Sequence, residues 1–214
     1  MSAMSQEEIQ EIIERVRRRL GEAGEQPGVG LRAHAALSAA AEAELGEGIF
    51  PSIGDAVHAA SRAFAEYQRI GLEGRKAIVA SIRASMLEHA ENLAEMAVAE
   101  TGLGRVADKI VKNRLVIAKT PGPEDLELEA VTGDGGMMIT EFAPFGVVAG
   151  ITATTNPTPT SIHNTIEIVS AGNALVFNVH PNARRVSADN IRLVNRAIVA
   201  AGGPENLVTA IPEP

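Results

Sequence analysis

The sequence predicts an α/β protein in which N-terminal helices are followed by a partial doubly wound (Rossmann-like) parallel β-α-β-α-β unit. Two observations in the last third of the chain support this prediction. Apolar runs of strand length alternate there with helical stretches, and glycines follow both helices, at Gly172 and at Gly202. Such alternation is typical of parallel sheets, whose strands are joined by right-handed crossover helices.

The first 20 residues predict a short amphipathic helix from Ser5 to Leu20. Glutamate and arginine occupy its polar faces, and its apolar stripe consists of Ile9, Ile12, Ile13, Val16 and Leu20. An isolated helix of this length is marginal in water, so the stripe needs a covering surface. We expect residues 1–20 to act as an addressing helix that docks on another protein, and the alternative is that the helix folds back on its own domain.

Residues 21–48 contain almost no bulky apolar side chain, which predicts a flexible linker before the main domain at 49–214. Three helices are then expected. The first runs from Ile53 to Tyr67, the second starts near Glu73 and continues to the glycines of ETGLGR, and the third covers 106–118. The apolar pattern that indicates the first helix is Ile53, Val57, Ala60, Phe64 and Tyr67, and the pattern of the second is Ile78, Ile82, Met86, Leu93 and Met96.

After a turn at the glycines 133, 135 and 136, residues 137–142 read as an extended segment. The predicted sheet follows, with strands at 147–152, 174–179 and 206–211 and helices at 158–171 and 183–201. Thr158 is the expected N-cap of the first crossover helix, with Pro159 in its first position.

Composition excludes several classes of function. The formal net charge of -8 disfavours nucleic acid or an anionic membrane surface as the main partner. No apolar run approaches the roughly 20 residues of a membrane span, so we expect an intracellular protein. The chain has no cysteine and its five histidines show no metal-ligand spacing, so we expect neither disulfides nor a metal site.

Ligands of open parallel sheets bind beyond the carboxyl ends of the strands, which here are followed by TATTNPT and HPNA. The carboxamide of Asn156 could donate N–H groups to a developing negative oxygen, as an oxyanion hole requires. The alternative is that Asn156 only caps a turn before Pro157. His180 and Pro181 could shape a nucleotide pocket or form an exposed loop, and the glycine fingerprint G-x-G-x-x-G is missing.

Three segments resemble the CoA-acylating aldehyde dehydrogenases of bacterial microcompartments, of the ethanolamine- and propanediol-utilisation type. They are ETGLGRVADKIVKN, TGDGGMMITEFAPFGVVAGITATTNPT and AAGGPENLVTAIPEP, and the resemblance covers residues 49–214 together with a comparable leading helix. It implies oxidation of a short aldehyde by NAD, with coenzyme A as co-substrate, to acyl-CoA and NADH. It also implies a homo-oligomer in the microcompartment lumen, with a shell or core protein bound through residues 5–20.

The resemblance further implies roles for individual residues. A cysteine would add to the aldehyde, and Asn156 would stabilise the hemithioacetal oxyanion. Two residues, Thr154 and Thr155, would line the nicotinamide side, and three would lie near the adenosine: Asn178, His180 and Pro181. General aldehyde dehydrogenases favour a lysine at the position that aligns with Asn178.

The family's cysteine, its cofactor loop and its remaining strands would follow the position where this sequence ends. We therefore expect the chain to be the N-terminal part of such an enzyme and to be inactive alone. The competing hypothesis is a non-catalytic assembly or adaptor protein that keeps the amphipathic helix and the half-domain for binding.

Overall fold

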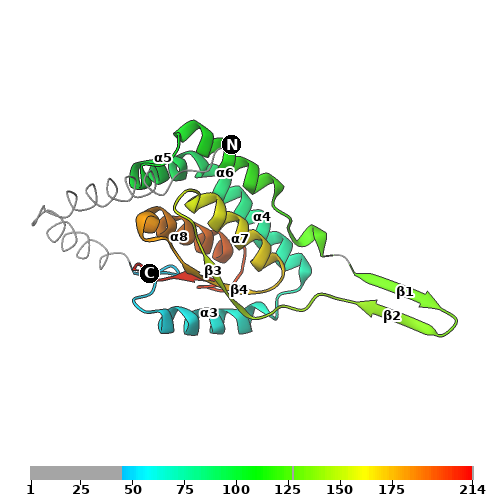
Figure 1. Ribbon diagram of the computed structural model, residues 1–214. Helices are drawn as coiled ribbons and strands as arrows, with labels where there is room; N and C mark the ends of the chain where they lie inside the picture. Colours follow the sequence, from blue (N-terminus) through cyan, green and yellow to red (C-terminus); the bar gives the residue numbers. More distant parts are fainter. Residues whose placement is uncertain (1–44, 127, 214) are drawn as a thin grey trace, which may run out of the picture. The chain divides into compact units, whose positions relative to one another are not determined.

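The computed structural model describes residues 45–126 and 128–213, which form one α/β unit (Figure 1). The predicted addressing helix and nearly all of the predicted linker lie outside the described residues. The last linker residues are an exception, because residues 46–49 form a hydrogen-bonded turn beside the sheet. This turn belongs to the same compact unit as the sheet.

Three parallel strands form the sheet in the order β3-β4-β5, as the sequence predicts. Their bounds are Val147–Ile151, Ala174–Asn178 and Val208–Ala210. Helix α7 (Pro157–Ser170) connects β3 to β4, and α8 (Arg184–Ala200) connects β4 to β5. The unit is thus a β-α-β-α-β half of a doubly wound fold, and the predicted fold class is confirmed.

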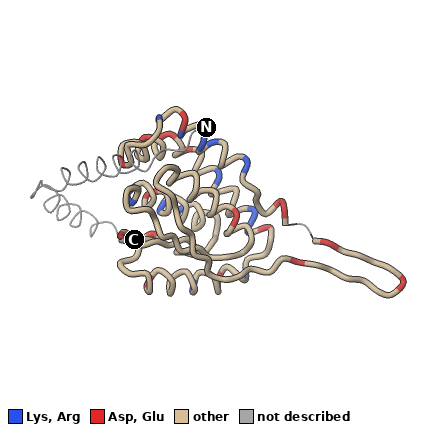
Figure 2. The backbone as a smooth tube through the Cα atoms, viewed as in Figure 1, with Lys and Arg blue, Asp and Glu red and all other residues tan. Residues whose placement is uncertain are grey.

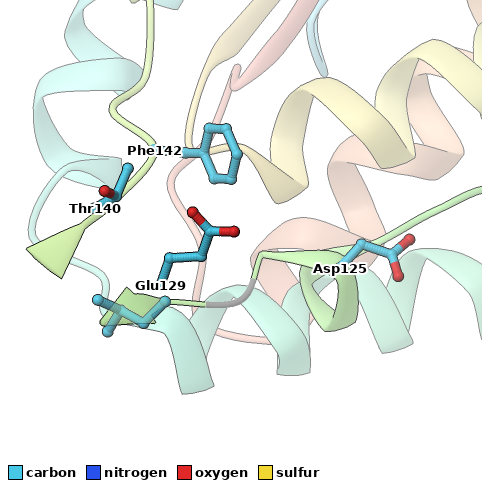
Figure 3. Close-up of a pocket in the computed structure, with 5 residues that line it drawn as sticks. Asp125, Glu129, Thr140 and Phe142 are labelled. Atoms are coloured by element: carbon cyan, nitrogen blue, oxygen red, sulfur yellow. The ribbon is translucent and has the colours of Figure 1, made fainter. Parts of the chain in front are cut away.

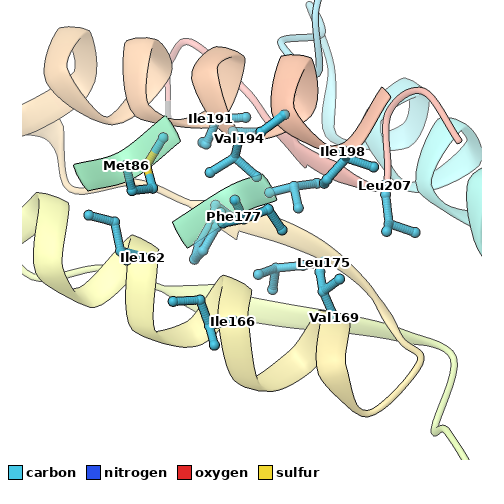
Figure 4. Close-up of a cluster of buried hydrophobic side chains, with 14 of the residues drawn as sticks. Met86, Ile162, Ile166, Val169, Leu175, Phe177, Ile191, Val194, Ile198 and Leu207 are labelled. Carbon is cyan, nitrogen blue, oxygen red and sulfur yellow. The ribbon is translucent and has the colours of Figure 1, made fainter. Parts of the chain in front are cut away.

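The main core lies between this sheet and the helices α7 and α8 (Figure 4). Leu175 and Phe177 project from β4 into it and are fully buried there. The side chains that surround them come mainly from the two crossover helices and include Ile162, Ile166, Val169, Ile191, Val194 and Ile198. Because side chains alternate along a strand, Ala174 and Val176 face the opposite side of the sheet.

Helix α3 (Ile53–Tyr67) covers that opposite side (Figure 1). Its buried face is built mainly from small residues, namely Ala56, Ala59, Ala60 and Ala63, with Tyr67 at the end. Two members of the predicted apolar stripe are instead exposed, Ile53 at 52% and Val57 at 38%. The helix and its buried Ala60 and Tyr67 are as the pattern indicates, but alanines, which permit close approach to the sheet, make up most of the buried face.

Three further helices pack on the outside of α7 and α8. They are α4 (Leu72–Glu88), α5 (Ala90–Thr101) and α6 (Val106–Lys119). The sequence predicted α4 and α5 as a single helix, which is wrong, because the chain leaves helical geometry at His89. No helix in the described residues is both long enough and apolar enough to cross a membrane.

A two-stranded antiparallel hairpin, β1 (Glu129–Gly133) and β2 (Gly136–Thr140), follows the short 3-10 helix η2 (Pro123–Asp125). Only its second strand was expected. Every residue of both strands is exposed, and the hairpin extends away from the helices and the parallel sheet (Figure 1). Its exposed apolar side chains are Val131, Met137, Met138 and Ile139.

Candidate functional site

The loops that follow β3 and β4 meet at the carboxyl edge of the sheet, and Thr152 joins them. Its backbone N–H donates to the carbonyl of Asn178 at 3.2 Å. Its hydroxyl accepts from the backbone N–H of His180 at 3.1 Å. The two polar segments that the sequence singled out are therefore neighbours in space, as parallel strand ends should be.

Asn156 occupies the N-cap position of α7, and its carbonyl accepts the first helical hydrogen bond from Thr160. Its side chain makes no capping bond. Instead, the side-chain oxygen Oδ1 accepts from Nζ of Lys112 at 2.8 Å. The amide nitrogen Nδ2 lies 3.5 Å from the hydroxyl of Thr155, which is long for a hydrogen bond, so its donors are largely uncommitted.

Lys109 and Lys112 lie one turn apart on α6 and both reach the loop after β3. The side chain of Lys109 is 5% exposed and donates to the backbone carbonyl of Thr155 at 2.9 Å. Burial lowers the pKa of the Lys109 ammonium, and the charge of Lys112 lowers it further. The Lys109 side chain passes close to Gly104, where a Cβ atom would lie 3.3 Å from Cε of the lysine.

Thr158 is not the N-cap that the sequence predicted. The helix begins at Pro157, and the buried hydroxyl of Thr158 donates to Oδ1 of Asn113 at 2.9 Å. The amide of Asn113 in turn donates to the carbonyl of Ala90 at 3.0 Å. This buried chain of hydrogen bonds fixes α6 against the start of α7, and Thr158 has a packing role in place of a capping role.

The remaining predicted cofactor residues lie around the same edge. Thr154 is half-buried, and its hydroxyl has no hydrogen-bond partner within the described residues. Thr155, Asn178 and Pro181 are exposed, whereas His180 is half-buried and its Nδ1 accepts from the backbone N–H of Asn182 at 3.1 Å. Polar and accessible side chains at a strand end fit the polar part of a nucleotide.

Glu100, at the end of α5, approaches the same edge from another helix. Its carboxylate accepts from the backbone N–H groups of Arg185 and Val186, at 2.9 and 2.8 Å, in the first turn of α8. The local N-cap of α8 is Ala183, which has no side-chain acceptor. Glu100 therefore satisfies two backbone N–H groups at the start of α8.

Sequence reasoning missed Glu100, Lys109, Lys112 and Asn113 as site residues. The last three do show a signal, because positions 109, 112 and 113 fall on one face of a helix. Polar residues on a face that packs inward indicate long-range hydrogen bonds, but they do not identify the partner.

A separate hollow of about 440 Å³ lies at the base of the hairpin and is lined by Asp125, Leu128, Glu129, Thr140 and Phe142 (Figure 3). It contains none of the predicted site residues. Its polar side chains are two carboxylates and a hydroxyl, and no amide, histidine or basic side chain lines it. The carboxyl edge of the parallel sheet therefore remains the candidate functional site.

Comparison with known proteins identifies relatives of this unit. The model of the aldehyde dehydrogenase family matches residues 44–214. A CoA-propanoylating propanal dehydrogenase of Citrobacter freundii is 43% identical over 177 residues, which cover 82% of this chain and 38% of that protein. The chain therefore spans less than half the length of this relative.

Two solved structures have the same fold over the matched part. One is a propionaldehyde dehydrogenase of Rhodopseudomonas palustris with bound CoA and an acylated cysteine. The other is a propionaldehyde dehydrogenase from the fucose utilisation bacterial microcompartment of Clostridium phytofermentans. Each gives a TM-score of 0.77 at 43% identity and covers 79% of this chain and 39% of its own.

Proposed function

Since the chain belongs to the aldehyde dehydrogenase family, we propose that it supplies the first part of an enzyme that converts a short aldehyde, NAD and coenzyme A to acyl-CoA, NADH and a proton. The similarity to a CoA-propanoylating enzyme supports this reaction. The nucleophilic cysteine must come from outside this sequence, which contains none.

The observation that carries the proposal is the hydrogen bonding of the Asn156 carboxamide. Its oxygen is engaged by Lys112, whereas its N–H donors are largely uncommitted at the carboxyl end of β3. When a thiolate adds to an aldehyde, the carbonyl oxygen becomes negative, and a fixed N–H donor stabilises that charge. A capping role would have directed the side-chain oxygen toward the N–H groups of α7, and no such bond is present.

The cofactor would lie along the same edge. The exposed side chains of Asn178 and Pro181 and the half-buried His180 would contact the adenosine, with Thr154 and Thr155 on the nicotinamide side. NAD, when bound, supplies the hydride acceptor of the reaction. The loops after β3 and β4 contribute no lysine or arginine before Arg184, because none occurs between Lys119 and Arg184.

Assembly and location follow the same proposal. The exposed apolar side chains of the β1–β2 hairpin suit contact with another subunit of a homo-oligomer. Residues 5–20 would bind a microcompartment shell or core protein, which would place the enzyme in the microcompartment lumen. The similarity to an enzyme from a fucose utilisation microcompartment supports this location.

Replacement of Asn156 in the complete enzyme tests the proposed role. Asn156→Ala removes the donor, and we expect the turnover number to fall by about 10²- to 10³-fold with little change in cofactor affinity. The replacement Asn164→Ala, on the half-buried side of α7 farther from the loop, serves as a control. A turnover number of Asn156→Ala within a few-fold of the wild type would show that Asn156 is only a turn residue.

A further inference from the structure

The ammonium of Lys112 donates a hydrogen bond to the Asn156 carboxamide, the group proposed to bind the oxyanion. Lys112 lies on α6, 44 residues before Asn156 in the sequence. We propose that Lys112 is a positioning residue that holds the Asn156 carboxamide with its N–H donors toward the reacting oxygen. This inference rests on the proposed oxyanion role of Asn156.

The chemistry of the contact determines the orientation of the amide. A lysine ammonium donates hydrogen bonds and accepts none, so the atom of Asn156 that faces it must be the oxygen Oδ1. Rotation of the amide by 180° would place its NH₂ group against the ammonium, which is unfavourable. Lys112 therefore selects the one orientation that leaves Nδ2 available as a donor.

Charge adds to this geometric effect. The ammonium polarises the amide it contacts, which makes the N–H groups better donors to a negative oxygen. Lys109, one turn earlier, places a second positive charge beneath the same loop through its bond to the Thr155 carbonyl. Figure 2 shows basic residues on α6, while the hairpin that follows has only acidic ones.

The position of α6 is fixed by neighbours that do not take part in the contact. Asn113, the next residue after Lys112, is fully buried and links Thr158 to the carbonyl of Ala90. The backbone that carries Lys112 is thus held on both sides, and only its exposed side chain spans the distance to Asn156. A site supported in this way is preorganised, because little freedom is lost when substrate binds.

A double-mutant cycle in the complete enzyme tests the inference. The variants are Lys112→Met, Lys112→Arg and Asn156→Ala, with the combination of the first and third. Lys119→Met is the matched control, since Lys119 is an exposed lysine at the end of the same helix. The turnover number and KM for aldehyde are measured for each, together with the melting temperature.

We expect Lys112→Met to lower the turnover number by about 10-fold, less than the loss of the donor itself, with KM within about twofold. Arginine should restore most of the activity, and Lys119→Met should have no effect. In the Asn156→Ala background, Lys112→Met should cost nothing further, because the group it positions is gone.

Three results would overturn the inference. An equal loss from Lys112→Met in both backgrounds would mean that the lysine acts independently of Asn156. A large loss from Asn156→Ala beside an unaffected Lys112→Met would refute the inference and leave the proposed function intact. No effect of Asn156→Ala would remove the oxyanion role and the positioning role together.

Discussion

The carboxylate of Glu100 lies 2.8 Å from the backbone nitrogen of Val186 and accepts its hydrogen bond, although the two residues are 86 positions apart. With its second bond to Arg185, Glu100 provides the cap that Ala183 cannot provide locally. This contact fastens α5 to the first turn of α8, which directly follows the loop where the adenosine contacts are predicted.

Glu100→Ala should lower the free energy of unfolding by about 1–2 kcal/mol, since two N–H groups lose a charged acceptor. Glu100→Gln should lose less, because its amide oxygen can still accept. Urea denaturation at neutral pH measures both, with Glu95→Ala as the control at an exposed position of the same helix. Equal stability of Glu100→Ala and Glu95→Ala would mean that water replaces the cap without cost.

Glu47 should make an acid-sensitive contribution to stability. Its carboxylate pairs with Arg196 of α8 at 2.7 and 2.5 Å, and these hydrogen bonds lower the pKa of Glu47 below its ordinary value. The contribution is therefore present above the ordinary glutamate pKa and is lost as the pH falls through the lowered value.

Because the Glu47 side chain is 45% exposed, Glu47→Gln should cost at most about 1 kcal/mol at pH 7. The difference between wild type and variant should disappear in acid. Chemical denaturation from pH 7 down to pH 3 measures it, with Glu66→Gln as the control on α3. A difference that stays constant over this range would contradict an ionic origin.

The N-terminal segment gives a third prediction, which concerns residues outside the described part. Ile12→Asp with Ile13→Asp would place charge in the apolar stripe that we propose for docking. Each fully buried side chain could contribute about 1.5–3 kcal/mol before ordering costs, which suits reversible binding. The complete enzyme carrying both changes should therefore sediment with microcompartment shells much less than the wild type.

The control for this experiment is Glu11→Gln with Glu14→Gln, which changes the predicted polar face only, and a deletion of residues 1–20 gives the lower limit. Undiminished sedimentation of the Asp variant, or loss of folding on deletion, would show that the segment serves its own domain.

The fourth prediction is that this chain alone does not form acyl-CoA. In the proposed mechanism Asn156 stabilises charge, but an amide cannot form a thioester, and the sequence provides no thiol. The assay combines purified chain, a short aldehyde, NAD and coenzyme A, with the complete enzyme as positive control. Formation of acyl-CoA and NADH above the blank would contradict the prediction that the reaction needs a cysteine from outside this sequence.

The parallel sheet could be predicted because its strands and crossover helices are local patterns with clear ends. Helix α3 also begins at a local signal, where the hydroxyl of Ser52 accepts from the backbone of Asp55. The start of α8 has no such signal, because its cap is Glu100 on another helix. The first hairpin strand, Glu129–Gly133, was missed because all its residues are exposed and no face alternates.

In the candidate site, too, some residues could be predicted from local sequence and others could not. Asn156 could be found from the sequence, since it follows an apolar strand and precedes Pro157 at a helix start. Its partner Lys112 could not, because the contact depends on how α6 packs against α7. Periodicity places a lysine on a helix face, but only the tertiary fold determines which loop that face meets.

The order β3-β4-β5 has one more consequence, which concerns how the sheet can grow. The outer side of β5 is already covered, because Ala210 exchanges backbone hydrogen bonds with Gly48 and Phe50. Within the described residues, no strand pairs with the outer side of β3. A strand that joins this sheet would therefore pair with β3. In the wider sheet β3 would be an interior strand and no longer an edge strand. Asn156 and its loop would then lie at the point where the connections from neighbouring strands run to opposite faces of the sheet. Ligands of doubly wound folds bind in the crevice at this point, so Asn156 would lie at the centre of the enlarged sheet.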